Sequence, residues 1–177
     1  MRQEQADTGF KNAVEDNRAA LLAYFQRRLL NPDDAAEAFG ELLLTAWRLH
    51  RRMPSEPTEA RMWLYGVAHN VLRNSRRTLA RRSAAVQRLA DDLRSAAPES
   101  VDDVALSVRE AIASLADDDA ELVRLIYWDG LASHEAAAVL HINPSTARTR
   151  LARAKQKLKS ALSYSESICD EHASSLT

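Results

Sequence analysis

The chain has few of the residues that form disulfides, break helices or loosen the backbone: one cysteine, five prolines and four glycines among 177 residues. The single thiol, Cys169, excludes an intrachain disulfide framework and fits a reducing compartment. No stretch reaches the roughly 18 consecutive apolar residues that a membrane span needs, and the N-terminus lacks the apolar run of a secretory signal. We therefore expect a cytoplasmic protein without membrane insertion.

The residues that are common, including alanine, leucine, arginine and glutamate, lose little rotamer freedom in a helix. Hydrophobic residues make up 46% of the chain, which is enough for packed cores. The sequence predicts an all-α fold with two small helical domains joined by a linker, the C-terminal one a helix-turn-helix. The expected ranges are 1–82 and 108–162 for the domains, 83–107 for an acidic, flexible linker and 163–177 for a polar tail.

The net charge of −1 hides a strongly uneven distribution of charge along the chain. Arginine outnumbers the acids from 48 to 94, acids dominate from 99 to 121, and 143–160 contains arginine and lysine but no acid. Two basic blocks separated by an acidic stretch make nucleic acid a candidate partner, which the whole-chain average conceals.

Helix boundaries are expected where turn and cap residues interrupt the apolar periodicity. The dipeptide Asn31-Pro32 separates the first two helices, and a third begins near Ala60 after a proline-containing loop. Two pairs of acids have the spacing of a capping box, in which one carboxylate accepts backbone N–H groups and the other reaches back. These pairs are Asp34 with Glu37 and Asp118 with Glu121.

The most informative stretch is 131–158, LASHEAAAVLHINPSTARTRLARAKQKL. Ser133 is placed to cap a short helix. Asn143 and Pro144 suit the N-cap and the first position of a second helix. A short helix, a turn and a basic amphipathic helix together predict a helix-turn-helix, whose second helix places its first turns in the major groove of DNA.

Polar and basic residues of the second helix are the candidate DNA contacts. Arginine reads guanine through two hydrogen bonds, and threonine meets a thymine methyl group or a phosphate. The alternative is a solvated charged face, but the capped turn and the missing acids favour DNA binding. The expected contacts are Asn143, Ser145, Thr146, Arg148, Thr149, Arg150, Arg153 and Lys155.

Two segments in this order resemble the extracytoplasmic-function sigma factors of bacterial RNA polymerase. Residues 111–158 resemble the −35-binding domain of that family. LLAYFQRRLLNPDDAAEAFGELLLTAWRLHRR and RMWLYGVAHNVLRNSRR resemble its core-binding and −10-binding domain. The match covers about 10–82 and 108–162, and it implies a subunit that directs core RNA polymerase to promoters and helps to melt the −10 element.

The resemblance also implies roles for residues of the first domain. The loop 53–59 resembles the one that captures a flipped −10 base, at an unstacking cost of a few kcal/mol. The implied −10 contacts are Asn70, Arg73, Asn74, Arg76 and Arg77. The implied contacts with the polymerase β′ clamp helices are Asp34, Glu37, Glu41, Leu43 and Trp47.

The partners that the resemblance implies are core RNA polymerase, through its β′ clamp helices and β flap, promoter DNA, and an anti-sigma factor. The sequence departs from the family at Gly40, where a glutamine usually precedes Glu41. A glycine within a helix costs about 1 kcal/mol relative to alanine, and this position puts core affinity in question. His141 replaces the usual glycine of the turn, which histidine tolerates because it is enriched at positive φ.

Other residues have simpler interpretations. At helical spacing, Trp47 and Trp63 are expected to pack in the core rather than to stack on bases. His134-Glu135 resembles the start of a zinc-protease motif, but Ala138 stands where the second histidine would be. We therefore expect no metal, no cofactor and no enzymatic activity.

Two other functions remain open from the sequence. A stand-alone helix-turn-helix regulator would bind its operator tightly without polymerase. A sigma-like decoy would bind polymerase without initiating transcription, and the altered clamp-binding helix with Gly40 keeps this interpretation open.

Overall fold

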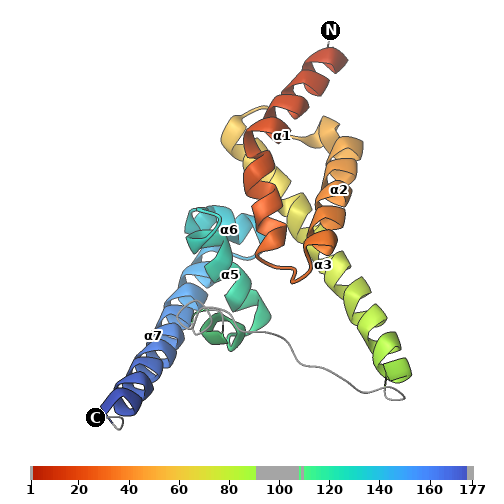
Figure 1. Ribbon diagram of the computed structural model, residues 1–177. Coiled ribbons are helices and arrows are strands. Elements are labelled where there is room, and N and C mark those ends of the chain that lie inside the picture. The colour runs from red at the N-terminus through yellow and green to blue at the C-terminus, as the bar shows by residue number, and fades with distance from the viewer. Residues whose placement is uncertain (1, 91–107, 109, 175–177) are drawn as a thin grey trace. The chain divides into compact units, whose positions relative to one another are not determined.

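The computed structural model describes residues 2–90, 108 and 110–174. The chain divides into two compact units, Met1–Ser95 and Ala96–Thr177. Every regular element in the described residues is a helix, as Figure 1 shows, which confirms the all-α prediction. None of these helices is both long and apolar enough to cross a membrane.

The first unit contains three long helices and one short one. They are α1 (Arg2–Gln26), α2 (Pro32–Leu49), the 3-10 helix η1 (His50–Arg52) and α3 (Pro57–Ala90). The three long helices pack pairwise against one another, and in Figure 1 α3 extends beyond the ends of the other two.

The core of the first unit lies between α1, α2 and α3. The ring of Tyr24 meets the rings of Phe25 and Tyr65 edge to face, with centroids 5.3 and 5.7 Å apart. Full burial of a large aliphatic or aromatic side chain stabilises a fold by about 1.5–3 kcal/mol. The largest side chains without exposed surface in this unit are Leu21, Tyr24, Phe25, Leu42, Leu64, Tyr65 and Leu72.

The cap of α2 differs from the predicted one. Asn31 has an extended backbone, and its Oδ1 accepts a hydrogen bond from the Asp33 N–H at 2.8 Å, while Pro32 is the first helical residue. The capping box predicted for Asp34 and Glu37 is therefore wrong. Asp34 already lies within the first turn, where a negative charge is favoured by the helix dipole.

The third helix begins at Pro57, three residues before the predicted start. Glu56 Oε2 accepts a hydrogen bond from the Glu59 N–H at 2.8 Å. Backbone hydrogen bonds from Glu59 and Thr58 lower the pKa of the Glu56 carboxyl, so its capping contribution is present above the usual glutamate pKa and is lost as the pH falls through the lowered value. The predicted loop 53–59 is correspondingly shorter, with only 53–56 lying between η1 and α3.

The second unit has three named helices and a short helical stretch at 110–113. The helices are α5 (Asp117–Tyr127), α6 (Ser133–Val139) and α7 (Pro144–Ser174). They pack pairwise around a core that includes Ile112, Leu115, Ala120, Val123 and Ala154. Trp128 packs against this cluster, together with Leu151 and Leu158 of α7.

The predicted caps of α5 and α6 are wrong by one or two residues. Ala116 precedes α5 and offers no side-chain acceptor, and Glu121 is buried rather than placed in a cap. Ala132, not Ser133, precedes α6, and its N–H donates to Glu135 Oε2 at 2.7 Å. Spacing of acids alone did not locate these helix starts.

The predicted domain limits remain predictions. α3 continues to Ala90, beyond the expected limit at 82, and α7 continues to Ser174, into the segment predicted as a tail. Of the predicted linker, 91–107 lie outside the described residues.

Replacing Asn31 with alanine removes the oxygen that accepts the Asp33 N–H at the start of α2. We expect the free energy of unfolding to fall by about 1 kcal/mol, measured by urea denaturation followed by tryptophan fluorescence. Glu37→Ala is the matched control, because Glu37 is exposed on the same helix and is not a cap residue. Equal losses in the two variants would contradict the assignment of the cap to Asn31.

Candidate nucleic-acid interface

The turn between α6 and α7 is closed by two backbone hydrogen bonds. The His141 N–H donates to Ala138 O at 3.2 Å, and the Ile142 N–H donates to Ala137 O at 3.0 Å. His141 has a φ of 55°, as expected for the residue in place of the family's glycine. This pattern is the Schellman motif, and it ends α6 at a defined residue.

The start of α7 agrees with the sequence prediction. Asn143 Oδ1 accepts hydrogen bonds from the Ser145 N–H at 2.9 Å and from the Ser145 hydroxyl at 2.8 Å. Pro144 is the first residue of the helix. Asn143 therefore serves as the N-cap, and its side-chain oxygen is occupied within the protein.

Helix α7 has one buried stripe and one wide exposed face. Ala147 and Ala154 have no exposed surface, and Leu151 and Leu158 pack against the core beside them. The stripe follows steps of three and four residues, as predicted. The exposed members of the predicted DNA-binding set are Asn143, Ser145, Thr146, Arg148, Thr149, Arg153 and Lys155.

Arg150 differs from the other members of this set. Only 28% of its side chain is exposed, and its Nη1 lies 3.3 Å from Asp118 Oδ2. Its Nε lies 4.0 Å from Asp119 Oδ1. Lys155, on the other flank of α7, holds its Nζ 5.6 Å from the centre of the Tyr127 ring.

The predicted −10 contacts lie along α3. Asn70, Arg73, Asn74 and Arg77 are exposed and follow one another at the spacing of a single helical face. Arg76 is partly buried and lies off that face. The structure thus brings four of the five residues together.

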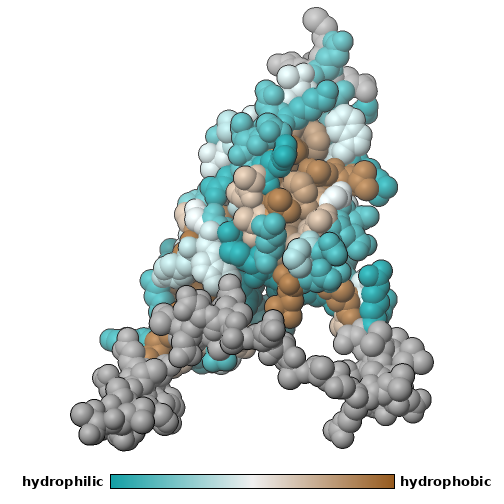
Figure 2. Space-filling view, viewed as in Figure 1, coloured by the Kyte–Doolittle hydropathy of each residue, from teal (hydrophilic) through white to brown (hydrophobic). Residues whose placement is uncertain are grey.

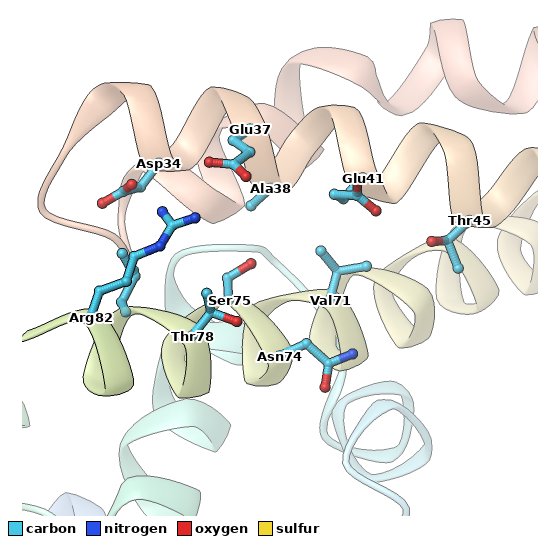
Figure 3. Close-up of a pocket in the computed structure, with 11 residues that line it drawn as sticks. Asp34, Glu37, Ala38, Glu41, Thr45, Val71, Asn74, Ser75, Thr78 and Arg82 are labelled. Atoms are coloured by element: carbon cyan, nitrogen blue, oxygen red, sulfur yellow. The ribbon is translucent and has the colours of Figure 1, made fainter. Parts of the chain in front are cut away.

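A groove of about 260 Å³ lies between α2 and α3 and is hereafter called the α2–α3 groove. Three of the predicted polymerase contacts, Asp34, Glu37 and Glu41, line it from α2. Asn74 and Arg82 line it from α3, and Figure 3 shows the Arg82 side chain extending toward the carboxylates of Asp34 and Glu37. The groove therefore combines residues that the sequence assigned to two separate partners.

Trp47 is not a core residue, contrary to the expectation from helical spacing. It is 45% exposed, and its ring stacks on His50 with centroids 4.7 Å apart and meets Phe10 edge to face at 5.5 Å. His50 Nδ1 lies 2.6 Å from Trp47 O, and its Nε2 lies 2.9 Å from Asp7 Oδ1. Trp47 therefore covers the place where α1 meets the end of α2, with one ring face toward the protein.

Leu44 is an exposed residue that the sequence reasoning missed. It is 53% exposed and lies three positions before Trp47 on α2. Figure 2 shows hydrophobic side chains gathered at the surface where α2 lies in Figure 1. The sequence signal was the run of three leucines at 42–44, only the first of which is fully buried.

The loop at 53–56 borders a larger cavity of about 730 Å³. Asn12, Asp16 and Asn17 of α1 line it together with Met53 and Ser55. These α1 residues were not among the predicted contacts, because nothing in the sequence places the first helix beside the loop. Within the described residues, no three His, Cys, Asp or Glu side chains gather in a group that could hold a metal ion.

Comparison with known proteins identifies relatives for both units. Residues 13–82 match the family described as Sigma-70 region 2, and residues 105–158 match the family described as Sigma-70, region 4. The ECF RNA polymerase sigma factor SigL of Mycobacterium tuberculosis, in strains H37Rv and Erdman, is 28% identical over 167 residues, which cover 89% of this chain and 91% of that protein.

Two solved structures share the fold. One is CnrH in complex with the cytosolic domain of CnrY, with a TM-score of 0.63 and 23% identity over 91% of this chain and 94% of that chain. The other is the sigma factor RpoE in complex with the anti-sigma factor NepR from Bartonella quintana, with a TM-score of 0.61 and 23% identity over 87% and 96% of the two chains. The resemblance drawn from the sequence is confirmed by these matches.

The turn at position 141 offers a test of the helix-turn-helix geometry. At a φ of 55° a β-branched side chain is strained, whereas glycine is not. We expect His141→Val to lose about 1–2 kcal/mol of unfolding free energy and His141→Gly to equal or exceed the original stability, measured by thermal denaturation. A valine variant as stable as the original chain would contradict the positive φ at this position.

Proposed function

Because the chain belongs to the extracytoplasmic-function sigma factors of RNA polymerase, we propose that its two units divide the recognition of a promoter between them. As a sigma factor it directs core RNA polymerase to promoters. In our proposal the second unit reads the −35 element, and the first unit binds core polymerase and helps to melt the −10 element. The chain acts by binding and not by catalysis.

The exposed face of α7, fixed by the capped turn, is the observation that carries this proposal. Arg148, Thr149 and Arg153 are exposed on the first turns of the helix, where a recognition helix meets base edges. A bidentate contact from arginine to guanine contributes about 1–3 kcal/mol of discrimination. Thr146, Lys155 and the backbone N–H groups at the start of α7 would contact phosphates and set the position of the helix.

The exposed face of α3 is our candidate for the −10 element. Asn70, Arg73, Asn74 and Arg77 offer amide and guanidinium groups along one line, which suits a single strand and its phosphates. The loop at 53–56 and its neighbouring cavity are the candidate site for a flipped base. Arg76, partly buried and off this face, would contribute less than the other four.

Helix α2 is our candidate for the surface that binds core polymerase. It presents carboxylates at Asp34, Glu37 and Glu41 and apolar surface nearer its C-terminal end, at Leu43, Leu44 and Trp47. A side chain added at Gly40 would meet no atom within 4 Å, so packing does not require glycine there. The fold therefore does not exclude glutamine at this position. Its replacement by glycine changes the surface that α2 offers to a partner.

An anti-sigma factor is a further proposed partner. Both of the similar solved structures described above are complexes, and the protein bound to RpoE in the second is an anti-sigma factor. Since a sigma factor works on core polymerase and promoter DNA, we also propose that this chain works in the cytoplasm. Its partner would compete with polymerase for the first unit or with DNA for the second.

Removing two readers of the −35 element tests the assignment of α7. We expect Arg148→Ala combined with Arg153→Ala to lower run-off transcription with core polymerase at least tenfold, because two base or phosphate contacts are lost. Affinity for core polymerase, measured by titration, should be retained. Lys11→Ala combined with Arg18→Ala removes the same charge from exposed positions of α1 and should leave transcription unchanged.

The same assay distinguishes the alternatives drawn from the sequence. Binding to polymerase without any transcript would favour a decoy. Tight promoter binding by the chain alone, without polymerase, would favour a stand-alone regulator.

Two exposed leucines of the first unit test the polymerase surface. Leu44 lies on α2, and Leu30 lies in the connection before it and is fully exposed. We expect Leu44→Ser to weaken core binding about tenfold, which corresponds to a loss of about 1.4 kcal/mol on truncating an interface residue. Leu30→Ser is the control and should have no effect. Equal effects in a polymerase titration would remove Leu44 from the proposed surface.

A further inference from the structure

We propose that Arg150 is a positioning residue that holds α7 against α5 and is not one of the residues that read the −35 element. This inference rests on the proposed function of α7. It separates Arg150 from Arg148, which the sequence alone treated as equivalent.

The register of α7 places Arg150 on the protein side of the helix. It follows the fully buried Ala147 by three residues and precedes the fully buried Ala154 by four, so all three side chains leave the same side of α7. Thr149 leaves another side and is exposed, whereas Arg153, also exposed, lines the same acidic pocket at 117–119 as Arg150. The Arg150 stem therefore starts beside the core and not on the outward face.

The guanidinium of Arg150 is directed to the first turn of α5. Nη1 donates a hydrogen bond to Asp118 Oδ2 at 3.3 Å, while Nε lies 4.0 Å from Asp119 Oδ1. The side chain of Asp118 is 79% exposed, so solvent largely screens its contact with Arg150. Asp119 is 17% exposed and Arg150 28%, so this longer contact is less screened. Planar guanidinium groups suit such contacts with two carboxylates.

The first turn of α5 lacks a side-chain cap from the residue that precedes it. Ala116 provides no side-chain acceptor, and three consecutive aspartates begin the helix. Their charges suit the helix N-terminus but repel one another, and a cation from α7 offsets that repulsion. Arg150, in the second turn of α7, thus contacts the first turn of α5 through Asp118, 32 residues earlier in the sequence.

This role matters for recognition because the direction of α7 determines which side chains reach base edges. A small change in the angle between α7 and α5 moves Arg148 and Arg153 relative to the major groove of the DNA. Specific contacts depend on this placement, whereas nonspecific attraction to phosphates does not. Loss of the pair should therefore reduce the preference for the correct −35 sequence more than it reduces DNA binding in general.

The test uses holoenzyme assembled from core polymerase and the full chain, titrated with promoter DNA that carries either the matching or a scrambled −35 element. Arg150→Ala should lower the preference for the matching element about fivefold, without changing the slope of log affinity against log salt. Asp118→Asn combined with Asp119→Asn should lower it by a similar factor. Combining all three substitutions should cause no further loss, because they break the same contact.

The opposite results would overturn the inference. If Arg150 contacts DNA and the aspartates compete for it, the two Asp→Asn substitutions will strengthen DNA binding, and Arg150→Ala will reduce the salt slope by about one. The inference would also be overturned if neither the Arg150 variant nor the double Asp→Asn variant changed the preference for the matching −35 element. Circular dichroism of each variant checks that the helices remain folded.

Arg148→Ala separates this inference from the proposed function. It should reduce both the preference and the salt slope if α7 reads the −35 element. If it changes neither, the proposed function of α7 fails. If it behaves as expected while Arg150→Ala also reduces the slope, only the positioning role fails.

Discussion

The proposed DNA-binding surface of the second unit depends on the turn from 140 to 143, because this turn sets the direction in which α7 leaves α6. Two backbone hydrogen bonds close the end of α6, and Asn143 caps the start of α7. The left-handed backbone of His141 makes the reversal possible within four residues. Apart from the side chains of Asn143 and Ser145, the turn is held by backbone groups, so the other side chains on the outward face of α7 are left to meet a partner.

Local sequence signals predicted this turn well. Asn143 followed by Pro144 is a strong start signal, and the alternation of alanine and leucine along α7 matched its buried stripe. The signals at other helix starts were weaker. Pairs of acids three residues apart are common in helical proteins, and at Asp34 the stronger Asn31-Pro32 signal lay just before them. An N-cap is therefore better located by Asn or Ser before proline than by the spacing of acids.

The rest of the site could not be predicted because it depends on contacts between distant residues. Helical register separates Arg150 from Arg148, but no local signal identifies its partner Asp118, 32 residues earlier. The exposure of Trp47 likewise depends on Phe10 and His50, which cover only one side of its ring. Periodicity gives the side of a helix that is buried, but it does not show where the neighbouring helices end. Trp47 lies near the end of α2, beyond full cover by α1 and α3.

The uneven charge of the chain follows from how its two interfaces must work. If every arginine of α7 faced outward, the second unit would bind any DNA through phosphate contacts, and its specificity would fall. Directing Arg150 to the aspartates of α5 removes one such contact and places carboxylates near the start of the recognition helix. In the proposed assignment, each unit alone binds DNA modestly. Core polymerase then supplies the missing affinity for DNA. A partner that binds both the chain and DNA raises the effective concentration of the chain at its DNA site without adding contacts between them. A net charge near zero is thus compatible with promoter recognition when affinity comes from the assembly and sequence discrimination comes from a few oriented side chains.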